Sequence, residues 1–248
     1  MLTAVRRVSL VLLVASLCAL SGTAIPADGD PVTVTGTVTV VGKSASAADA
    51  RDVVVWLKPV LATGAAPSAL AVARQKPRMI QRNKVFEPGL LVVPVGSSVE
   101  FPNMDPFFHN VFSMFDGKRF DLGLYETGAS RSVTLSTTGV CYVFCNIHPE
   151  MSAVIVVIDT PYYAVSNRAG ELSIPNVPSG RYLLSLWHQR HKPERPSDFP
   201  REITISSTAA SVGPIRLVES NDAIAPHKNK YGRDYNPPPA TSPLYKKP

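Results

Sequence analysis

The sequence lacks a basic stripe with interleaved aromatic residues, a glycine-rich phosphate loop and a long apolar run. The first absence argues against nucleic acid as a partner, because the formal net charge of +6 is spread along the chain. The apolar run at residues 8–20 has 13 residues, whereas a membrane-spanning helix needs about 20. No Ser-His-Asp arrangement occurs in a recognisable context either. We therefore expect no catalytic residues and a protein that is not an enzyme.

The N-terminus has the three parts of a secretory signal. Arg6 and Arg7 precede the apolar run, and small residues follow it up to Thr23 and Ala24. We expect residues 1–24 to be a cleaved signal peptide, which makes the protein periplasmic or secreted and leaves no stable membrane span. An uncleaved anchor is the alternative. The mature chain would then carry a formal charge near +4 (6 − 2) and two of the three cysteines.

Helix-like stretches are scarce, and runs of Val, Thr, Ser, Gly and Pro predict an all-β protein. Two strands are expected in 31–60, and short strands at regular spacing in 77–158 are typical of a sandwich or Greek-key barrel. A second β-unit follows in 159–218, which is small for a sandwich with its own core. We expect 219–248 to be a disordered Pro-rich tail, in which HKNKYGRDY is a candidate docking segment.

The stretch CYVFCNIHPEM concentrates sulfur and imidazole groups. If CYVFC is a strand, Cys141 and Cys145 lie roughly 13 Å apart, too far for a disulfide, whose Cα atoms lie within about 7 Å. In the following loop, Cys145, His148 and Met151 are spaced so that they can turn toward one centre. Thiolate, imidazole and thioether form a soft ligand set that suits copper. A trigonal His₂Cys site needs another histidine, and His109 is the one in a suitable context.

Two segments, VGSSVEFPNMDPFFHNV and CNIHPEM, resemble the cupredoxins, such as plastocyanin, pseudoazurin and amicyanin. The resemblance covers roughly 77–158 and includes the strand pattern of residues 93–103 before the pair His109-Asn110. It implies a Greek-key sandwich that holds one type 1 copper ion. It also gives Asn110 the role of tying the two ligand loops together near the thiolate. The copper ligands implied by the resemblance are His109, Cys145, His148 and Met151.

Cys141 leaves an alternative open. The binuclear copper-A centre also resembles this stretch, because it uses a Cys-x3-Cys pair, but His148 lies only three residues after Cys145 instead of four. The preferred interpretation of Cys141 is a small buried residue. Nucleophilic Cys-His catalysis would need an oxyanion hole that nothing here supplies. The pair His188 and His191 is a candidate second metal site, although a surface or core polar role is favoured.

The stretch AVSNRAGELSIPNVPSGRYLLSLWH resembles the carboxypeptidase regulatory-like domain, a transthyretin-like sandwich. The two strands that open such a unit are missing just upstream of 159 but are present in 31–60. We therefore expect 31–60 to pair with 159–218, with the cupredoxin domain inserted between them. Exported bacterial proteins labelled methylamine-utilisation or plastocyanin-like resemble this combination. The matching residues are Gly170, Val177, Pro178, Gly180 and Tyr182.

The cupredoxin resemblance implies one-electron transfer by an exported blue-copper protein. The alternatives are a copper carrier or interaction module without electron transfer, and a metal-free structural sandwich. We expect Phe107, Phe108 and Pro149 to form an apolar patch near His148, where a redox partner protein docks. The nearby acidic residues are interpreted as ordinary turn and strand-edge carboxylates: Asp105, Asp116, Asp121 and Glu126.

Overall fold

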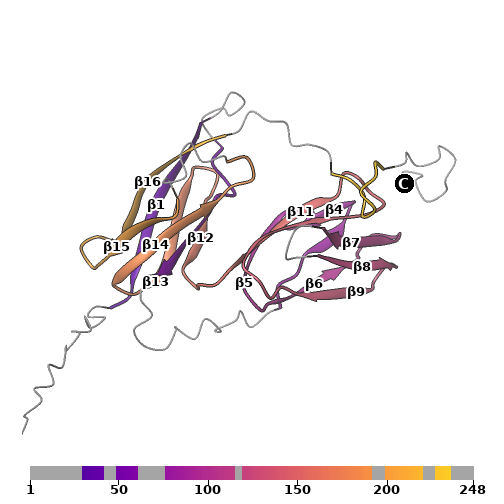
Figure 1. The fold of residues 1–248 in the computed structure, drawn as a ribbon, viewed down its shortest axis with the longest axis horizontal. Helices are drawn as coiled ribbons and strands as arrows, with labels where there is room; N and C mark the ends of the chain where they lie inside the picture. Colours follow the sequence, from indigo (N-terminus) through magenta and orange to yellow (C-terminus); the bar gives the residue numbers. More distant parts are fainter. Residues whose placement is uncertain are drawn as a thin grey trace, which may run out of the picture.

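The computed structural model describes residues 30–41, 49–60, 76–114, 119–191, 199–219 and 227–235. Within these ranges the chain consists of strands, turns and loops without a helix, which confirms the all-β prediction (Figure 1). No helix among these residues is long and apolar enough to span a membrane. The predicted signal peptide lies outside the described residues.

Residues 80–158 form a unit of three sheets (Figure 1). The largest has the order β5-β11-β10-β7-β8, with β11 parallel to β5 and the other neighbouring pairs antiparallel. The two small sheets pair β6 with β9 and β3 with β4. The strands are β3 (Ile80–Arg82), β4 (Val85–Glu87), β5 (Leu90–Pro94), β6 (Ser98–Pro102), β7 (His109–Ser113), β8 (Phe120–Tyr125), β9 (Ser130–Thr134), β10 (Gly139–Phe144) and β11 (Ser152–Ile158).

The remaining strands form two further sheets, with the orders β13-β1-β16 and β12-β2-β14-β15. An apolar cluster that includes Val34, Leu57, Ile174 and Leu184 contains buried residues from both. The strands are β1 (Val32–Val41), β2 (Val54–Pro59), β12 (Tyr163–Val165), β13 (Glu171–Val177), β14 (Gly180–Trp187), β15 (Arg201–Ile205) and β16 (Ser211–Val218).

The first two strands pair only with strands that follow the 80–158 unit in the chain. β1 runs antiparallel to β13 and parallel to β16, and β2 runs antiparallel to β12 and β14. In Figure 1 the indigo β1 accordingly lies among orange strands, apart from the magenta strands of the other unit. The chain thus leaves this pair of sheets after β2 and returns to it at β12.

The close approach of two strands explains a glycine in β1. A Cβ atom on Gly36 would come within 2.3 Å of Cγ2 of Val212, so a larger residue would push the β16 side chain away. On either side of Gly36, threonines alternate with Val34, Val38 and Val40, whose side chains are buried. This period of two is that of a strand with one face on the core.

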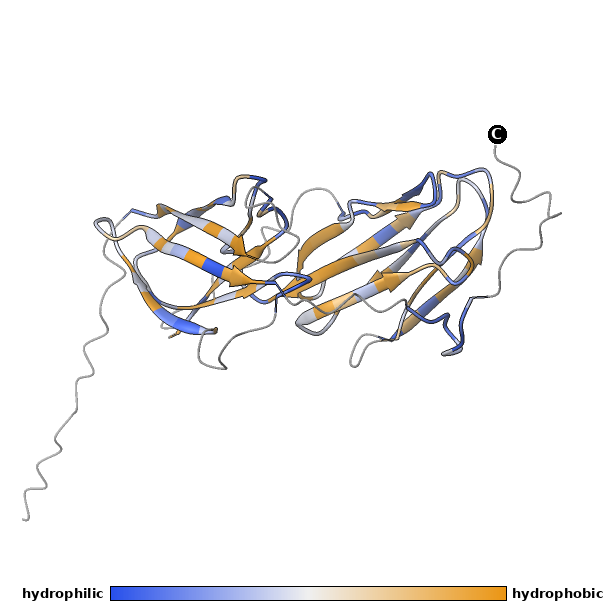
Figure 2. Cartoon of the chain, turned by 90° about the horizontal axis from the view of Figure 1, so that it is seen from above, coloured by the Kyte–Doolittle hydropathy of each residue, from blue (hydrophilic) through white to orange (hydrophobic). Residues whose placement is uncertain are grey.

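The two units meet through β11. Its run SAVIVVI is buried at every position after the first, so both faces of the strand are covered. Ala153, Ile155 and Val157 face the core of their own unit, whereas Val154 and Val156 join a separate cluster with Val54 of β2. The continuous apolar run is therefore that of a strand buried on both faces, and Figure 2 shows the strands carrying most of the hydrophobic residues.

Part of the predicted tail is packed on the protein. Residues 227–235 lie against the loop that follows β10 and hydrogen-bond to Asn146 and Pro149. The expectation of a disordered tail therefore does not hold for these nine residues, which are the whole of the candidate docking segment HKNKYGRDY. The other residues of 219–248, except Glu219, lie outside the described part of the chain.

Candidate metal centre

The strands of the largest sheet place three predicted ligands together. His109 is the first residue of β7, and Cys145 directly follows β10. The loop from Cys145 to Met151 is closed by its own main chain: the Cys145 amide donates to the Met151 carbonyl at 3.2 Å, and the Met151 amide donates to the His148 carbonyl at 3.1 Å. These bonds turn His148 back toward β7, where it meets His109.

The three potential ligand atoms form a compact triangle. His109 Nδ1 lies 3.1 Å from His148 Nδ1 and 3.8 Å from Cys145 Sγ, and His148 Nδ1 lies 3.6 Å from the same sulfur. All three residues are buried. Among the described residues, this is the one group of three or more His, Cys, Asp or Glu side chains with potential metal-ligand atoms so close together.

The triangle has the dimensions of a metal site. Three ligands in a plane around one ion stand roughly 3.5–3.8 Å apart when metal–nitrogen and metal–sulfur distances are about 2.0 and 2.3 Å, as for zinc. The two nitrogen–sulfur distances of 3.6 and 3.8 Å match this range, and the two nitrogens lie somewhat closer, at 3.1 Å. Two imidazole nitrogens and one sulfur are also donors that copper favours. The residues therefore fit a soft or borderline metal ion.

Asp105 fixes the protonation of the first histidine. His109 Nε2 lies 2.7 Å from Asp105 Oδ2, so the ring donates its Nε2 proton to the carboxylate and leaves a lone pair on Nδ1. The amides of Asn83 and Lys84 donate to the two oxygens of the same carboxylate at 2.6 and 2.9 Å. Burial would raise the pKa of Asp105, but hydrogen bonds from Lys84, His109 and Asn83 hold it below its usual range.

Asp105 is thus the site residue that the sequence interpretation missed, since an Asp next to Pro in a loop is usually an ordinary turn carboxylate. Its position four residues before His109 is the signal that could have found it.

The structure also describes two of the other carboxylates that were interpreted as ordinary turn and strand-edge residues. Asp121 accepts a hydrogen bond from the Asn110 side chain, and Glu126 is exposed. Asp116 lies outside the described residues.

Burial of the site favours neutral imidazole rings on both histidines. Burial, together with the neighbouring His109, lowers the pKa of His148 to about 4. Burial also lowers the pKa of His109, although Asp105 opposes this effect. Neutral rings keep lone pairs available for a metal.

The raised pKa of Cys145 keeps its thiol protonated in the absence of a metal ion. Burial raises the pKa of Cys145, and hydrogen bonds from the amides of Asn110, Ile147 and His148 to the sulfur only partly offset this. Metal binding displaces the thiol proton, because the thiolate is the ligand.

Asn110 contacts the sulfur of Cys145 through its main-chain amide, whereas its side chain bonds elsewhere. The side-chain amide donates to Asp121 at 2.7 Å, so it links β7 to β8 and does not reach the ligand loop. Its Oδ1 is buried without a hydrogen-bond partner among the described residues.

The two remaining sulfur residues of CYVFCNIHPEM are buried. Met151 ends the ligand loop and shares an apolar cluster with Cys145, and its role as a fourth ligand stays a prediction. Cys141 lies in β10, forms no disulfide with another described cysteine, and is absent from the group of potential ligands among the described residues. Its packing is that of a small core residue.

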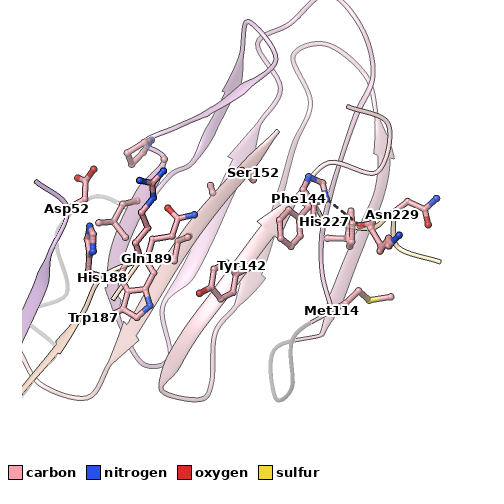
Figure 3. A pocket seen from close by; sticks show the side chains of 18 of the residues that line it. Asp52, Met114, Tyr142, Phe144, Ser152, Trp187, His188, Gln189, His227 and Asn229 are labelled. Carbon is pink, nitrogen blue, oxygen red and sulfur yellow. Dashed lines mark hydrogen bonds between the residues drawn. The ribbon is translucent and has the colours of Figure 1, made fainter. Parts of the chain in front are cut away.

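The second histidine pair is not assembled into a comparable group. His188 and His191 form a turn after β14, with the His191 amide donating to the His188 carbonyl at 3.1 Å. His188 Nδ1 and His191 Nε2 are buried without partners among the described residues, but no third ligand completes a group there. Figure 3 shows His188 and Trp187 at one end of a groove of about 1330 Å³, with Phe144 and His227 at the other.

The molecule is therefore an all-β protein with a buried His₂Cys cluster at the end of one sheet. No protein-family model matches the chain, and no curated protein matches it.

Several solved structures are similar to part of the chain. A purple cupredoxin from Nitrosopumilus maritimus is 24% identical with a TM-score of 0.31, and the match covers 33% of this chain and 99% of that one. A reduced mutant of amicyanin is 25% identical with a TM-score of 0.33, over 36% of this chain and 89% of that one. A copper-containing nitrite reductase from Thermus scotoductus is 23% identical with a TM-score of 0.33, over 48% of this chain and 28% of that one.

Proposed function

We propose that this chain is an exported cupredoxin-like protein that binds one copper ion and passes single electrons between partner proteins. The observation that carries the proposal is the convergence of His109 Nδ1, His148 Nδ1 and Cys145 Sγ within a buried triangle. Copper, when bound, would supply one-electron redox chemistry. The cleaved signal peptide at residues 1–24 and the resemblance of 159–218 to a carboxypeptidase regulatory-like scaffold belong to the same proposal.

Each residue has a separate task in this proposal. His109 presents a lone pair because Asp105 holds its other nitrogen. His148 is neutral because burial lowers its pKa to about 4. Cys145 gives up its proton when the metal binds, and the amides around its sulfur then stabilise the thiolate. Met151, at the end of the same loop, is the proposed fourth and weakest ligand.

The rigidity of the site supports electron transfer. Two ligands lie at the ends of strands β7 and β10, and the third lies in a short loop closed by main-chain hydrogen bonds. Sites built on such elements keep their geometry better than sites on open loops. A ligand set that does not rearrange would let the metal change oxidation state with little movement of the protein.

An apolar surface beside the site is the proposed docking face for the redox partner. The ring of Phe107 contacts both ligand rings edge-on, with centroids 5.3 Å from His109 and 5.5 Å from His148. Its neighbours Met104 and Phe108 are 54% and 51% exposed. Redox partners form small, brief contacts, for which a limited apolar surface of this kind suffices.

A copper titration tests the proposal. We expect Cu(II) to give the protein an intense visible band from thiolate-to-copper charge transfer, with one ion bound per chain. Cys145→Ser should abolish the band, whereas the matched control Cys141→Ser should keep it. A folded parent protein without the band would overturn the proposal. If the band forms with Cu(II) but the protein releases the copper ion on reduction, the result would identify a copper carrier in place of an electron shuttle.

A further inference from the structure

The segment 227–235 has an internal structure of its own. The Asn229 side chain accepts hydrogen bonds from the amides of Tyr231 and Arg233, at 2.9 and 3.1 Å, and donates to the carbonyl of Asp234. The main chain closes the same turn, because the Asn229 amide donates to the Arg233 carbonyl at 2.9 Å. An Asn side chain that hydrogen-bonds to following backbone amides stabilises a turn, so the segment has a defined local conformation.

This segment donates hydrogen bonds to three acceptors spread along the ligand loop. Two acceptors are main-chain carbonyls and one is a side-chain amide oxygen, and together they span the loop from its first ligand to the residue after His148. The donor–acceptor pairs are Tyr235 Oη with Cys145 O at 2.8 Å, the Lys230 amide with Asn146 Oδ1 at 2.9 Å, and His227 Nε2 with Pro149 O at 2.8 Å.

Ring stacking secures the same contact from the side of β10. The His227 ring stacks on Phe144, with centroids 4.1 Å apart and planes at 25°, and the Tyr235 ring stands edge-on to His227 at 5.2 Å. Figure 3 shows Phe144 beside His227 at this end of the groove. Phe144 directly precedes Cys145, so the segment holds the chain on both sides of the sulfur ligand.

A further link reaches the sulfur from the opposite side. The Lys230 ammonium lies 2.6 Å from Asp121 Oδ2, and the other oxygen of that carboxylate accepts from Asn110 at 2.7 Å. The main-chain amide of the same Asn110 donates to the Cys145 sulfur. Lys230 therefore connects the segment to β7 and β8 as well as to the ligand loop.

We propose that residues 227–235 form a strap that belongs to the metal centre, and that Tyr235 and His227 are positioning residues for the ligand loop. The strap holds Cys145 and His148 in the arrangement that receives the metal, before the metal binds. Its importance for copper rests on the proposed function. Removing a segment that only covered the surface would leave the conformation of the ligand loop unchanged. Removing a strap would leave the three loop acceptors hydrogen-bonded to water instead of to residues 227–235, and the loop would be held less firmly.

The first test uses the full-length protein without metal. Tyr235→Phe removes the bond to the Cys145 carbonyl and keeps the ring, and Tyr231→Phe, at a tyrosine 71% exposed in the same segment, is the matched control. We expect amide hydrogen exchange within 145–151 to rise about tenfold in Tyr235→Phe, which corresponds to the loss of one hydrogen bond. Exchange in the strands of the other unit should stay at the parent rate, and the control should match the parent throughout.

The second test uses the copper-loaded protein. In Tyr235→Phe and in a chain that ends at residue 226, we expect copper to pass to a chelator about tenfold faster or more, and the charge-transfer band to shift. Parent rates of loop exchange and copper release in both variants would overturn the proposal. A further outcome is that Cu(II) gives no band in the parent protein while amide hydrogen exchange in the ligand loop still rises in Tyr235→Phe. That result would refute the copper function and would keep the proposal that the strap holds the ligand loop in place.

Discussion

Replacing Asp105 by Asn tests the idea that a carboxylate sets the protonation of the first metal ligand. The Asp105 carboxylate accepts the Nε2 proton of His109 at 2.7 Å and two amide hydrogens, from Asn83 and Lys84, at 2.6 and 2.9 Å. An amide side chain has a single acceptor oxygen. Asp105→Asn must therefore turn its NH₂ group either toward the two amide donors or toward the His109 ring.

Either orientation damages the site. If the NH₂ group faces His109, the ring can satisfy it only by accepting on Nε2, which moves the ring proton to Nδ1, where the metal lone pair is needed. If it faces the amide donors of Asn83 and Lys84, like groups oppose each other and the loop that carries Asp105 loses support. The charge-assisted bond itself contributes about 1.5–3 kcal/mol, and loss of a carboxylate partner of a metal-binding histidine typically weakens metal binding about 10- to 100-fold.

Copper affinity should be measured by competition with a chelator of known affinity. We expect Asp105→Asn to bind copper about 10- to 100-fold more weakly, and the control Asp159→Asn, which alters a carboxylate paired with Lys58 in a surface ion pair, to bind like the parent. Because two amides also lose an acceptor, thermal unfolding must show that the variant is folded at the assay temperature. A folded Asp105→Asn protein with parent affinity would refute this account of the tautomer.

Two further predictions concern the free energy of unfolding of the metal-free protein. Burial lowers the pKa of His148 to about 4, so between roughly pH 6.5 and 4 the unfolded chain binds a proton that the folded chain does not, and stability falls with decreasing pH by up to about 3 kcal/mol. Urea unfolding at pH 7 and pH 4.5 measures this fall in the free energy of unfolding, which should be smaller in His148→Gln. An equal fall in both proteins would contradict its assignment to His148. Gly36→Ala should destabilise the protein by about 1–3 kcal/mol, because its Cβ would lie 2.3 Å from Val212 Cγ2; an unchanged urea midpoint would show that β16 can yield there.

The sequence predicts that His109, Cys145 and His148 lie close together, as they do in the structure, because each stands in a recognisable local pattern. Strand alternation separates Cys141 from Cys145, and the three-residue spacing between Cys145 and His148 brings both into one tight loop. The structure places His109 beside them through the pairing of β7 with β10. Local pattern and tertiary pairing therefore agree at these positions.

The parts that the sequence did not predict depend on contacts without a local pattern. Asp105 acquires its role only because the turn at Asn83 and Lys84 supplies amide donors to the same carboxylate. Residues 227–235 have the polar composition of a tail and attach through hydrogen bonds to carbonyl and amide oxygens, which leave no hydrophobic periodicity to detect. Such interactions follow from the fold and become visible only once it is known.

The pairing of β1 with β16 sets the order in which the polypeptide can be completed. Val38 of β1 lies opposite Ile215, so during synthesis β1 cannot be paired on that side until the chain has been made as far as β16. Contacts so distant in sequence form slowly, whereas the hairpin of β10 and β11 that frames the ligand loop joins residues close together in the chain. The 80–158 unit can therefore close while β1 is still unpaired on the side of β16, and the exposed threonines of β1 keep one face of that strand polar in the interval.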